Sequence, residues 1–285
     1  MIRTFALLAL LTTPAFAAEP CAPCAAWNTP QMPFRVYGNT YYVGPHGLAA
    51  ILVTSDQGHI LIDGALADSA GLIADYVSAL GFRLEDVKII LNTHAHYDHA
   101  GGIAELQRQT GAKVMASIPS IAEMVGGMAT RDDPQAAIAD HYPAVARATP
   151  IKDGETVTLG PLKLTAHFTP GHTPGGTTWT WTSCEGTACR NMVYADSLTA
   201  VSAPDFRFSA DAALVAGFKK SFATVAALPC DILLTPHPEA SALWDRLAKR
   251  EAGAKDALAT PGACRAYAET ARMSFEKRLA SEGPP

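Results

Sequence analysis

The stretch Asn92–Gly102, NTHAHYDHAGG, limits the possible folds of this chain more than any other part of the sequence. It places three histidines and one aspartate within six residues, directly after the apolar run VKIIL. Side chains two residues apart do not face each other on a helix, whereas in an extended strand they point to the same side. His94 and His96 can therefore share one metal ion if the buried strand Val87–Leu91 ends in an extended segment.

The neighbouring residues favour a second ion beside the first. Asp98 and His99 fall where the chain turns into the next predicted helix, so they can face another ion close by. His172 in TAHFTPGHTPGG and His237 in DILLTPHPE each follow a predicted strand, on loops that can reach the same sheet edge. Imidazole and carboxylate donors without thiolate suit zinc in a catalytic site better than a closed structural site.

The other histidines lack this context. His167 lies on a predicted strand, where a packed or exposed histidine is the simpler interpretation. His46, His59 and His141 occupy turns or polar surroundings, and we expect no metal there. Trp27 could cover the site from the N-terminal segment.

Apolar periodicity predicts strands and helices that alternate along the chain. A β-meander and strand–helix units, followed by the same pattern again, favour an α/β fold with two sheets face to face and helices outside. The predicted strands are PFRVYGNTYYVG, LAAILVTS, GHILIDG, Val87–Leu91, Lys113–Ala116 and a β-rich block over Ile151–Ala195. The predicted helices are Asp68–Leu80, His99–Thr110, Ala210–Ala227, Ala240–Ala252 and Cys264–Leu279.

Composition and the first residues set the cellular context. The formal net charge of -5 offers no basic face for phosphates, so we expect no nucleic-acid partner. The segment MIRTFALLALLTTPAFAAEP carries one early arginine, a short apolar run and the small-x-small pattern Ala15-Phe16-Ala17. These features predict a signal peptide over residues 1–17, a single domain over 18–285 and a periplasmic location without a membrane anchor.

Six cysteines fit an oxidising compartment, although they allow 15 pairings. Cys184 and Cys189 lie across CEGTAC, which resembles the tip of a hairpin, so we expect them to pair. Cys230 and Cys264 flank the C-terminal helical region and form the second expected pair. Cys21 and Cys24 form a CxxC, and their pairing stays open.

The histidine-rich stretch resembles the signature HxHxDH of the metallo-β-lactamase superfamily, matched by His94, His96, Asp98 and His99. The segments GHTPGG, YADSL and TPHPE follow in the family order. The resemblance implies a four-layer αββα sandwich. It is strongest to the β-lactamases of subclass B3, because Ser197 stands where another subclass has a ligating cysteine.

The resemblance also implies roles for individual residues. Two Zn²⁺ ions would be bound, one by His94, His96 and His172, and the other by Asp98, His99 and His237. Asp98 would orient a metal-bridging hydroxide, and Ser197 and Thr199 would contact the substrate or a water. Asp196 is left out of the predicted ligands, because the resembling lactamases do not use that position to bridge the metals.

The implied function is hydrolysis of the β-lactam amide bond of penicillins, cephalosporins and carbapenems by a monomer with a small-molecule substrate. Two alternatives stay open at this point. Another dinuclear zinc hydrolase, acting on a lactone or a thioester, would share every ligand. A periplasmic metal-binding protein without activity would share them as well.

Overall fold

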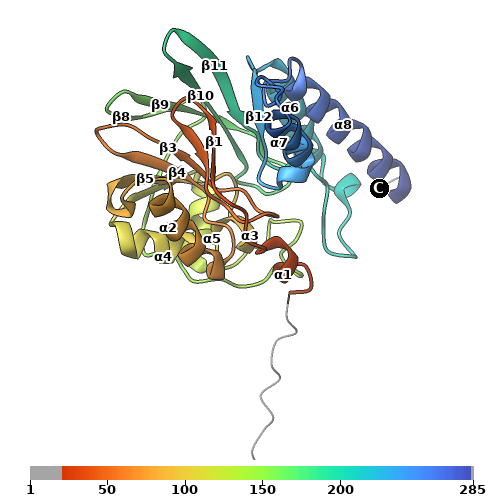
Figure 1. Ribbon diagram of the computed structural model, residues 1–285. Coiled ribbons are helices and arrows are strands. Elements are labelled where there is room, and N and C mark those ends of the chain that lie inside the picture. Colours follow the sequence, from red (N-terminus) through yellow and green to blue (C-terminus); the bar gives the residue numbers. More distant parts are fainter. Residues whose placement is uncertain (1–20, 284–285) are drawn as a thin grey trace, which may run out of the picture.

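Two β-sheets face each other at the centre of the computed structural model, which describes residues 21–283 (Figure 1). The expected signal peptide lies outside the described residues. The first sheet has seven strands, in the order β1 (Phe34–Tyr37), β2 (Thr40–Tyr42), β3 (Ile51–Val53), β4 (His59–Ile62), β5 (Val87–Leu91), β6 (Lys113–Ala116) and β7 (Ala148–Pro150). The second has five, in the order β12 (Ile232–Leu234), β11 (Ala188–Tyr194), β10 (Thr177–Glu185), β9 (Leu162–Phe168) and β8 (Thr156–Leu159).

Helices cover the outer faces of both sheets, as predicted. On the first sheet they are α2 (Ala70–Ala79), α4 (Ile103–Thr110) and α5 (Ile118–Gly126); on the second they are α6 (Ala212–Ala227) and α8 (Ala263–Glu282). The remaining helices are α1 (Cys24–Trp27), α3 (Tyr97–Ala100) and α7 (Leu243–Glu251). Among residues 21–283, no helix combines the length and the apolar character that crossing a bilayer requires.

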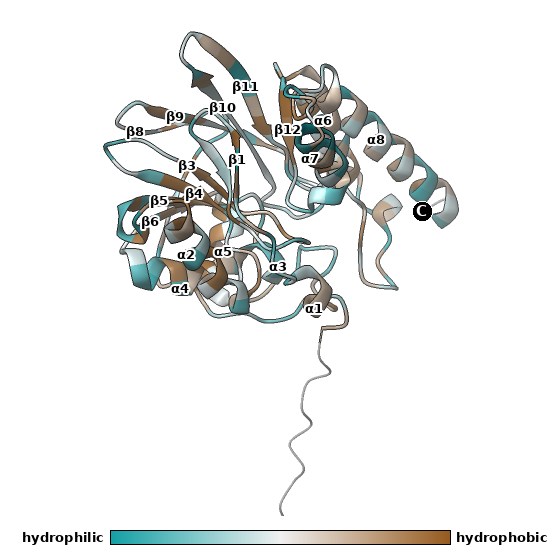
Figure 2. Cartoon of the chain, in the orientation of Figure 1, coloured by the Kyte–Doolittle hydropathy of each residue, from teal (hydrophilic) through white to brown (hydrophobic). Residues whose placement is uncertain are grey.

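Three apolar clusters hold the layers together. The inner faces of the sheets meet in one cluster, in which Trp179, Tyr42 and Tyr194 are fully buried. The two other clusters lie between each sheet and its helices. Figure 2 shows strand β12 as hydrophobic and helix α7, which buries Leu243, Arg246 and Leu247, as largely hydrophilic. Burial of apolar area on both faces of each sheet is the main stabilising contribution to such a sandwich.

Several details differ from the sequence-based expectation, and strand β7 and helix α1 were not predicted. The helix predicted over His99–Thr110 begins earlier and is interrupted, since α3 ends at Ala100 and α4 begins at Ile103. Gly101 lies in the interruption because a Cβ there would meet the Tyr97 carbonyl oxygen at 2.3 Å and the Ala67 nitrogen at 2.7 Å. Helix α5 was not predicted at all.

The described cysteines form three disulfides, and two of them are the expected pairs Cys184–Cys189 and Cys230–Cys264. The third joins Cys21 to Cys24, which the sequence left open. Cys184 and Cys189 are directly opposite each other in the β10–β11 hairpin. The bond between Cys230 and Cys264 closes a loop that contains β12 and α7.

Candidate metal centre

The predicted metal ligands gather at one edge of the sandwich because of strand direction. Strands β4, β5 and β6 are parallel, so their carboxyl ends share that edge. Residues His94 to His99 follow β5 there. In the second sheet β11 and β12 run parallel and β9, β10 and β11 alternate in direction. The loop between β9 and β10, which carries His172, and the segment after β12, which carries His237, therefore reach the same edge.

The first group consists of His94, His96 and His172. Each offers one ring nitrogen that lies within 4.8 Å of the other two, and all three side chains are buried. The ring centroids are 5.0 Å apart for His94 and His96, 4.8 Å for His94 and His172 and 5.0 Å for His96 and His172. Three imidazoles at these separations converge on one point between them.

The hydrogen bonds on the far side of these rings determine which nitrogen faces that point. His94 donates from Nδ1 to Asp196 Oδ1 at 2.8 Å, and His172 donates from Nδ1 to the Thr199 carbonyl oxygen at 2.8 Å. His96 instead donates from Nε2 to Asp133 Oδ2 at 3.1 Å. Carboxylate and carbonyl oxygens only accept, so the remaining nitrogen of each ring carries a free lone pair.

The second group lies beside the first. Asp98, His99 and His94 offer ligand atoms within 4.8 Å of one another. Asp98 Oδ2 is 3.1 Å from His99 Nε2 and 3.3 Å from His237 Nε2. The rings of His99 and His237 are 4.9 Å apart. His94 is thus common to both groups, and His237 lies beside Asp98 and His99, where the predicted ligand set placed it.

Unsatisfied buried nitrogens test whether the site fits a metal. His94 Nε2 and both ring nitrogens of His99 are buried and make no hydrogen bond, since the 3.1 Å approach of Asp98 lacks the required alignment. Leaving such groups without a partner costs free energy. A cation bound by these lone pairs would remove that cost, and the imidazole and carboxylate donors match zinc. The residues therefore fit a pair of metal ions.

The pKa shifts of His94, His172 and Asp98 favour metal binding. For His96, burial is outweighed by the hydrogen bond to Asp133 and its charge, which raise the pKa. Burial lowers the pKa of His94 well below its usual value, and the nearby ring of His99 lowers it further. Burial lowers the pKa of His172 to about 3. Burial opposes the ionisation of Asp98, but His99 and His237 outweigh it and hold the pKa of that carboxyl well below its usual range. Neutral imidazole and ionised carboxylate are the forms that bind metals.

Asp196 is outside both groups of candidate ligands. Its Oδ1 accepts from His94 Nδ1, while Oδ2 is buried without a hydrogen bond. The Tyr267 hydroxyl donates to the Asp196 carbonyl oxygen at 3.0 Å, which ties this segment to α8. Asp196 therefore orients a candidate ligand through Oδ1.

Asp63, at the end of β4, holds the loop that carries the first two histidines. Its Oδ1 accepts from Thr93 N at 2.8 Å and Asn92 Nδ2 at 3.1 Å. Its Oδ2 accepts from Thr93 Oγ1 at 2.7 Å and the Tyr194 hydroxyl at 2.9 Å. Burial raises the pKa of Asp63 to about 7, although these four donors stabilise the carboxylate. Asp63 also has a positive φ of 66°, a conformation that aspartate and asparagine tolerate.

Of the residues that the sequence placed near the site, Thr199 and Trp27 lie against histidines of the site, and Ser197 directly follows Asp196 in the chain. Ser197 is buried in the segment after β11. Besides its carbonyl, Thr199 places Oγ1 3.1 Å from His172 Nδ1. The Trp27 ring lies 5.3 Å from the ring of His237 and forms a wall of the second group.

Asp133 is not among the site residues predicted from the sequence. It lies in the Asp- and Pro-containing stretch between α5 and β7, where only the sequence DDP distinguishes it. No spacing rule connects this residue to His96, because 37 positions separate the two in the chain.

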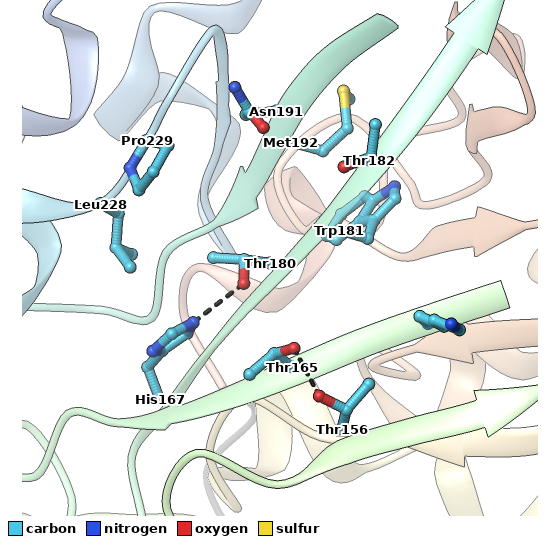
Figure 3. A pocket seen from close by; sticks show the side chains of 11 residues that line it. Thr156, Thr165, His167, Thr180, Trp181, Thr182, Asn191, Met192, Leu228 and Pro229 are labelled. Atoms are coloured by element: carbon cyan, nitrogen blue, oxygen red, sulfur yellow. Dashed lines mark hydrogen bonds between the residues drawn. The ribbon is translucent and has the colours of Figure 1, made fainter.

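The remaining histidines belong to neither group. His46 stacks on Trp244, with ring centroids 4.4 Å apart. His59 differs from expectation, since it lies in strand β4 and is buried. His167 lines a hollow of about 360 Å³ on the outer face of β9 and β10, where its Nε2 lies 2.9 Å from Thr180 Oγ1 (Figure 3).

Comparison with known proteins agrees with this geometry. Residues 43–185 match the Metallo-beta-lactamase superfamily. The structure of the Rm3 metallo-beta-lactamase is similar, with a TM-score of 0.91 and 52% identity, covering 93% of this chain and 99% of that one. MEM-A1, a subclass B3 metallo-beta-lactamase from a soil metagenome library, gives a TM-score of 0.87 and 50% identity, covering 90% and 98% of the two chains.

A curated relative matches over a shorter segment. A hydroxyacylglutathione hydrolase of Bradyrhizobium sp. (strain ORS 278) is 36% identical over 107 residues, which are 38% of this chain and 33% of that protein. The chain thus spans about a third of the length of this relative. From the match over residues 43–185 and the near-complete coverage of the solved structures, the chain belongs to the metallo-β-lactamase superfamily.

Proposed function

We propose that the protein is a zinc-dependent β-lactamase that opens the amide bond of β-lactam antibiotics. The observation that carries the proposal is the pair of adjacent ligand groups, with unsatisfied buried nitrogens on His94 and His99. The relatives that match over nine tenths of the chain are named as metallo-β-lactamases, one of them of subclass B3. Shared fold alone would not determine the activity, whereas the set of donors that this chain places on the fold supports it.

In this proposal His94, His96 and His172 hold one Zn²⁺, and Asp98, His99 and His237 hold the other. When bound, two zinc ions lower the pKa of a shared water from about 15.7 toward about 7 and polarise the carbonyl group of the lactam. All six cysteines form disulfides, so the chain offers no thiolate to either ion. The second ion would therefore have only nitrogen and oxygen donors from the protein.

The residues around the donors have separate tasks in the reaction. Asp98, held ionised beside His99 and His237, orients the attacking water. Ser197 and Thr199 contact the substrate carboxylate or a water from the segment after β11. Trp27 shields the second group from solvent on one side, because its ring lies beside His237.

A chelator experiment tests this function. Purified protein should hydrolyse nitrocefin, a penicillin and a carbapenem, lose this activity after dialysis with EDTA, and regain it when zinc is added. Metal analysis should find two zinc ions per chain before dialysis. Full activity in protein shown to be free of metal would contradict the proposal.

The hydroxyacylglutathione hydrolase relatives define the competing substrate class, because a thioesterase would use the same ligands. The same preparation should therefore be assayed on a glutathione thioester and on an acyl-homoserine lactone. Turnover of either, with none of the β-lactams, would assign the protein to another zinc hydrolase. A zinc-loaded protein inert toward all of them would be a metal-binding protein.

We further propose that the protein works in the periplasm as a monomer. The three disulfides support an oxidising compartment. N-terminal sequencing of the periplasmic fraction should find a chain that begins after Ala17, and light scattering should give the mass of one chain.

A further inference from the structure

His96 differs from the two other histidines of the first group in what holds its ring. His94 and His172 are held from segments that follow strand β11, through Asp196 and the Thr199 carbonyl. His96 is held by Asp133, which belongs to the stretch of residues 127–147 that forms neither helix nor strand. The side chains of His96 and Asp133 are 4% and 0% exposed, so no water competes for their hydrogen bond.

Asp133 is itself fixed in place by short contacts within its own loop. Its Oδ1 accepts from Gln135 N at 2.6 Å, and its backbone nitrogen donates to the Thr130 carbonyl at 2.9 Å. Its two carboxylate oxygens thus each accept one hydrogen bond, one from the loop and one from His96.

Helix α5 anchors the loop through a buried acid. Glu123 Oε1 accepts from Thr130 N at 3.1 Å and from Thr130 Oγ1 at 2.9 Å. Glu123 is completely buried, and its other oxygen makes no hydrogen bond. Thr130 in turn accepts from Asp133, so a continuous set of contacts leads from α5 to the ring of His96.

The loop is also joined to the segment that holds His172. The Pro134 carbonyl oxygen accepts from Ala203 N at 2.9 Å. Pro134 follows Asp133 directly, and Ala203 is four residues from Thr199. The supports of two histidines in the first group are therefore tied together across the site.

From these contacts we propose that Asp133 is the positioning residue of the first metal site. By accepting from Nε2, it keeps the proton on that nitrogen and leaves the Nδ1 lone pair of His96 for the ion. It also prevents the ring from rotating, and Glu123 supports it by holding Thr130. The inference rests on the proposed function, because it takes His96 as a zinc ligand.

Three substitutions separate this role from a general effect on folding. Asp133→Ala removes both acceptors. Asp133→Asn keeps the shape but has one acceptor for two donors, His96 Nε2–H and Gln135 N–H, so one hydrogen bond must be lost. Asp132→Asn is the matched control, because Asp132 is the exposed neighbour and the change in charge is the same.

Zinc affinity is the first measurement. A His237→Ala background removes a ligand of the second ion, so that competition with a chromophoric chelator reports the first site alone. Loss of a residue that orients a metal ligand typically weakens binding about 10- to 100-fold. We expect that range for Asp133→Ala, a smaller loss for Asp133→Asn and no change for Asp132→Asn.

The second measurement follows His96 directly. Long-range ¹H–¹⁵N spectra of the zinc-loaded protein should show His96 protonated at Nε2, with the pattern weakened or lost in Asp133→Ala. Glu123→Gln keeps the acceptor for Thr130 and should retain the affinity, whereas Glu123→Ala should lower it. Thermal unfolding monitors the fold of each variant, and Asp133→Asn keeps the test decisive if Asp133→Ala does not fold.

The experiments distinguish a failure of the Asp133 assignment from a failure of the proposed function. Wild-type zinc affinity and an unchanged His96 spectrum in Asp133→Asn and Asp133→Ala would overturn the assignment of Asp133 while leaving the proposed function intact. An unsubstituted protein that binds no zinc would refute the proposed function itself.

Discussion

The disulfide between Cys230 and Cys264 should stabilise the fold more than the one between Cys184 and Cys189. The first closes a loop with a sequence separation of 34 residues, and the second a loop of 5. In the chain-entropy treatment, the stabilisation grows with the logarithm of the loop length. These separations correspond to about 4 kcal/mol for Cys230–Cys264 and about 2 kcal/mol for Cys184–Cys189.

Packing should increase the difference in stabilisation between the two disulfides. Cys264 is 2% exposed and belongs to the apolar cluster between the second sheet and its helices. Its replacement by alanine removes a buried sulfur, which adds a cavity cost to the lost cross-link. Cys184 and Cys189 are both exposed at the end of the β10–β11 hairpin, so their replacement leaves no cavity.

The comparison uses two double variants, Cys230→Ala with Cys264→Ala and Cys184→Ala with Cys189→Ala. Urea unfolding at one fixed, saturating zinc concentration gives the free energy of unfolding of each, since bound metal contributes to the measured stability. We expect the Cys230/Cys264 variant to be less stable than the hairpin variant by about 2 kcal/mol or more. Equal losses, or a larger loss in the hairpin variant, would refute the loop-length argument.

Two further predictions concern the site. His237→Ala should bind one zinc per chain and be severely impaired in hydrolysis, while Ser197→Ala should keep two zincs and lose activity modestly. The zinc content of each variant is measured after dialysis against low-micromolar zinc. A single zinc in Ser197→Ala would make Ser197 a ligand. Asp63→Asn should lower the free energy of unfolding by about 1 to 3 kcal/mol, because an amide nitrogen would face two of the four donors; unchanged urea unfolding would contradict the importance of these contacts.

The periodicity of apolar residues predicted the sandwich, and the positions of the six candidate ligands just after predicted strands predicted that they converge. Both predictions use patterns that are local in the sequence. The apolar run VKIIL marks strand β5, and the segments that follow neighbouring parallel strands share one edge of the sheet. The split of the predicted helix at Gly101 was not foreseeable in this way. At Gly101 the Ala67 nitrogen approaches so closely that a side chain would not fit, and this contact joins segments far apart in the sequence.

The residues that orient the ligands through hydrogen bonds could not be predicted from the sequence either. The contact between His96 and Asp133 spans 37 positions, and that between His94 and Asp196 spans 102. A lone aspartate in a loop carries no signal of such a partner. Helix α5, which supports the loop, was missed although Ser117 caps its first turn by accepting from Ser120 N.

The division of the ligands between the two sheets would allow the chain to be converted into a zinc-controlled pair of fragments. The connection between β7 and β8 includes the exposed residues Lys152, Asp153 and Gly154. A break there would leave four of the six candidate ligands on the first fragment, and His172 and His237 on the second. Each ion would then have donors from both fragments, so zinc would favour their association by mass action. With a reporter attached to each fragment, the proximity of the two reporters would indicate the zinc concentration.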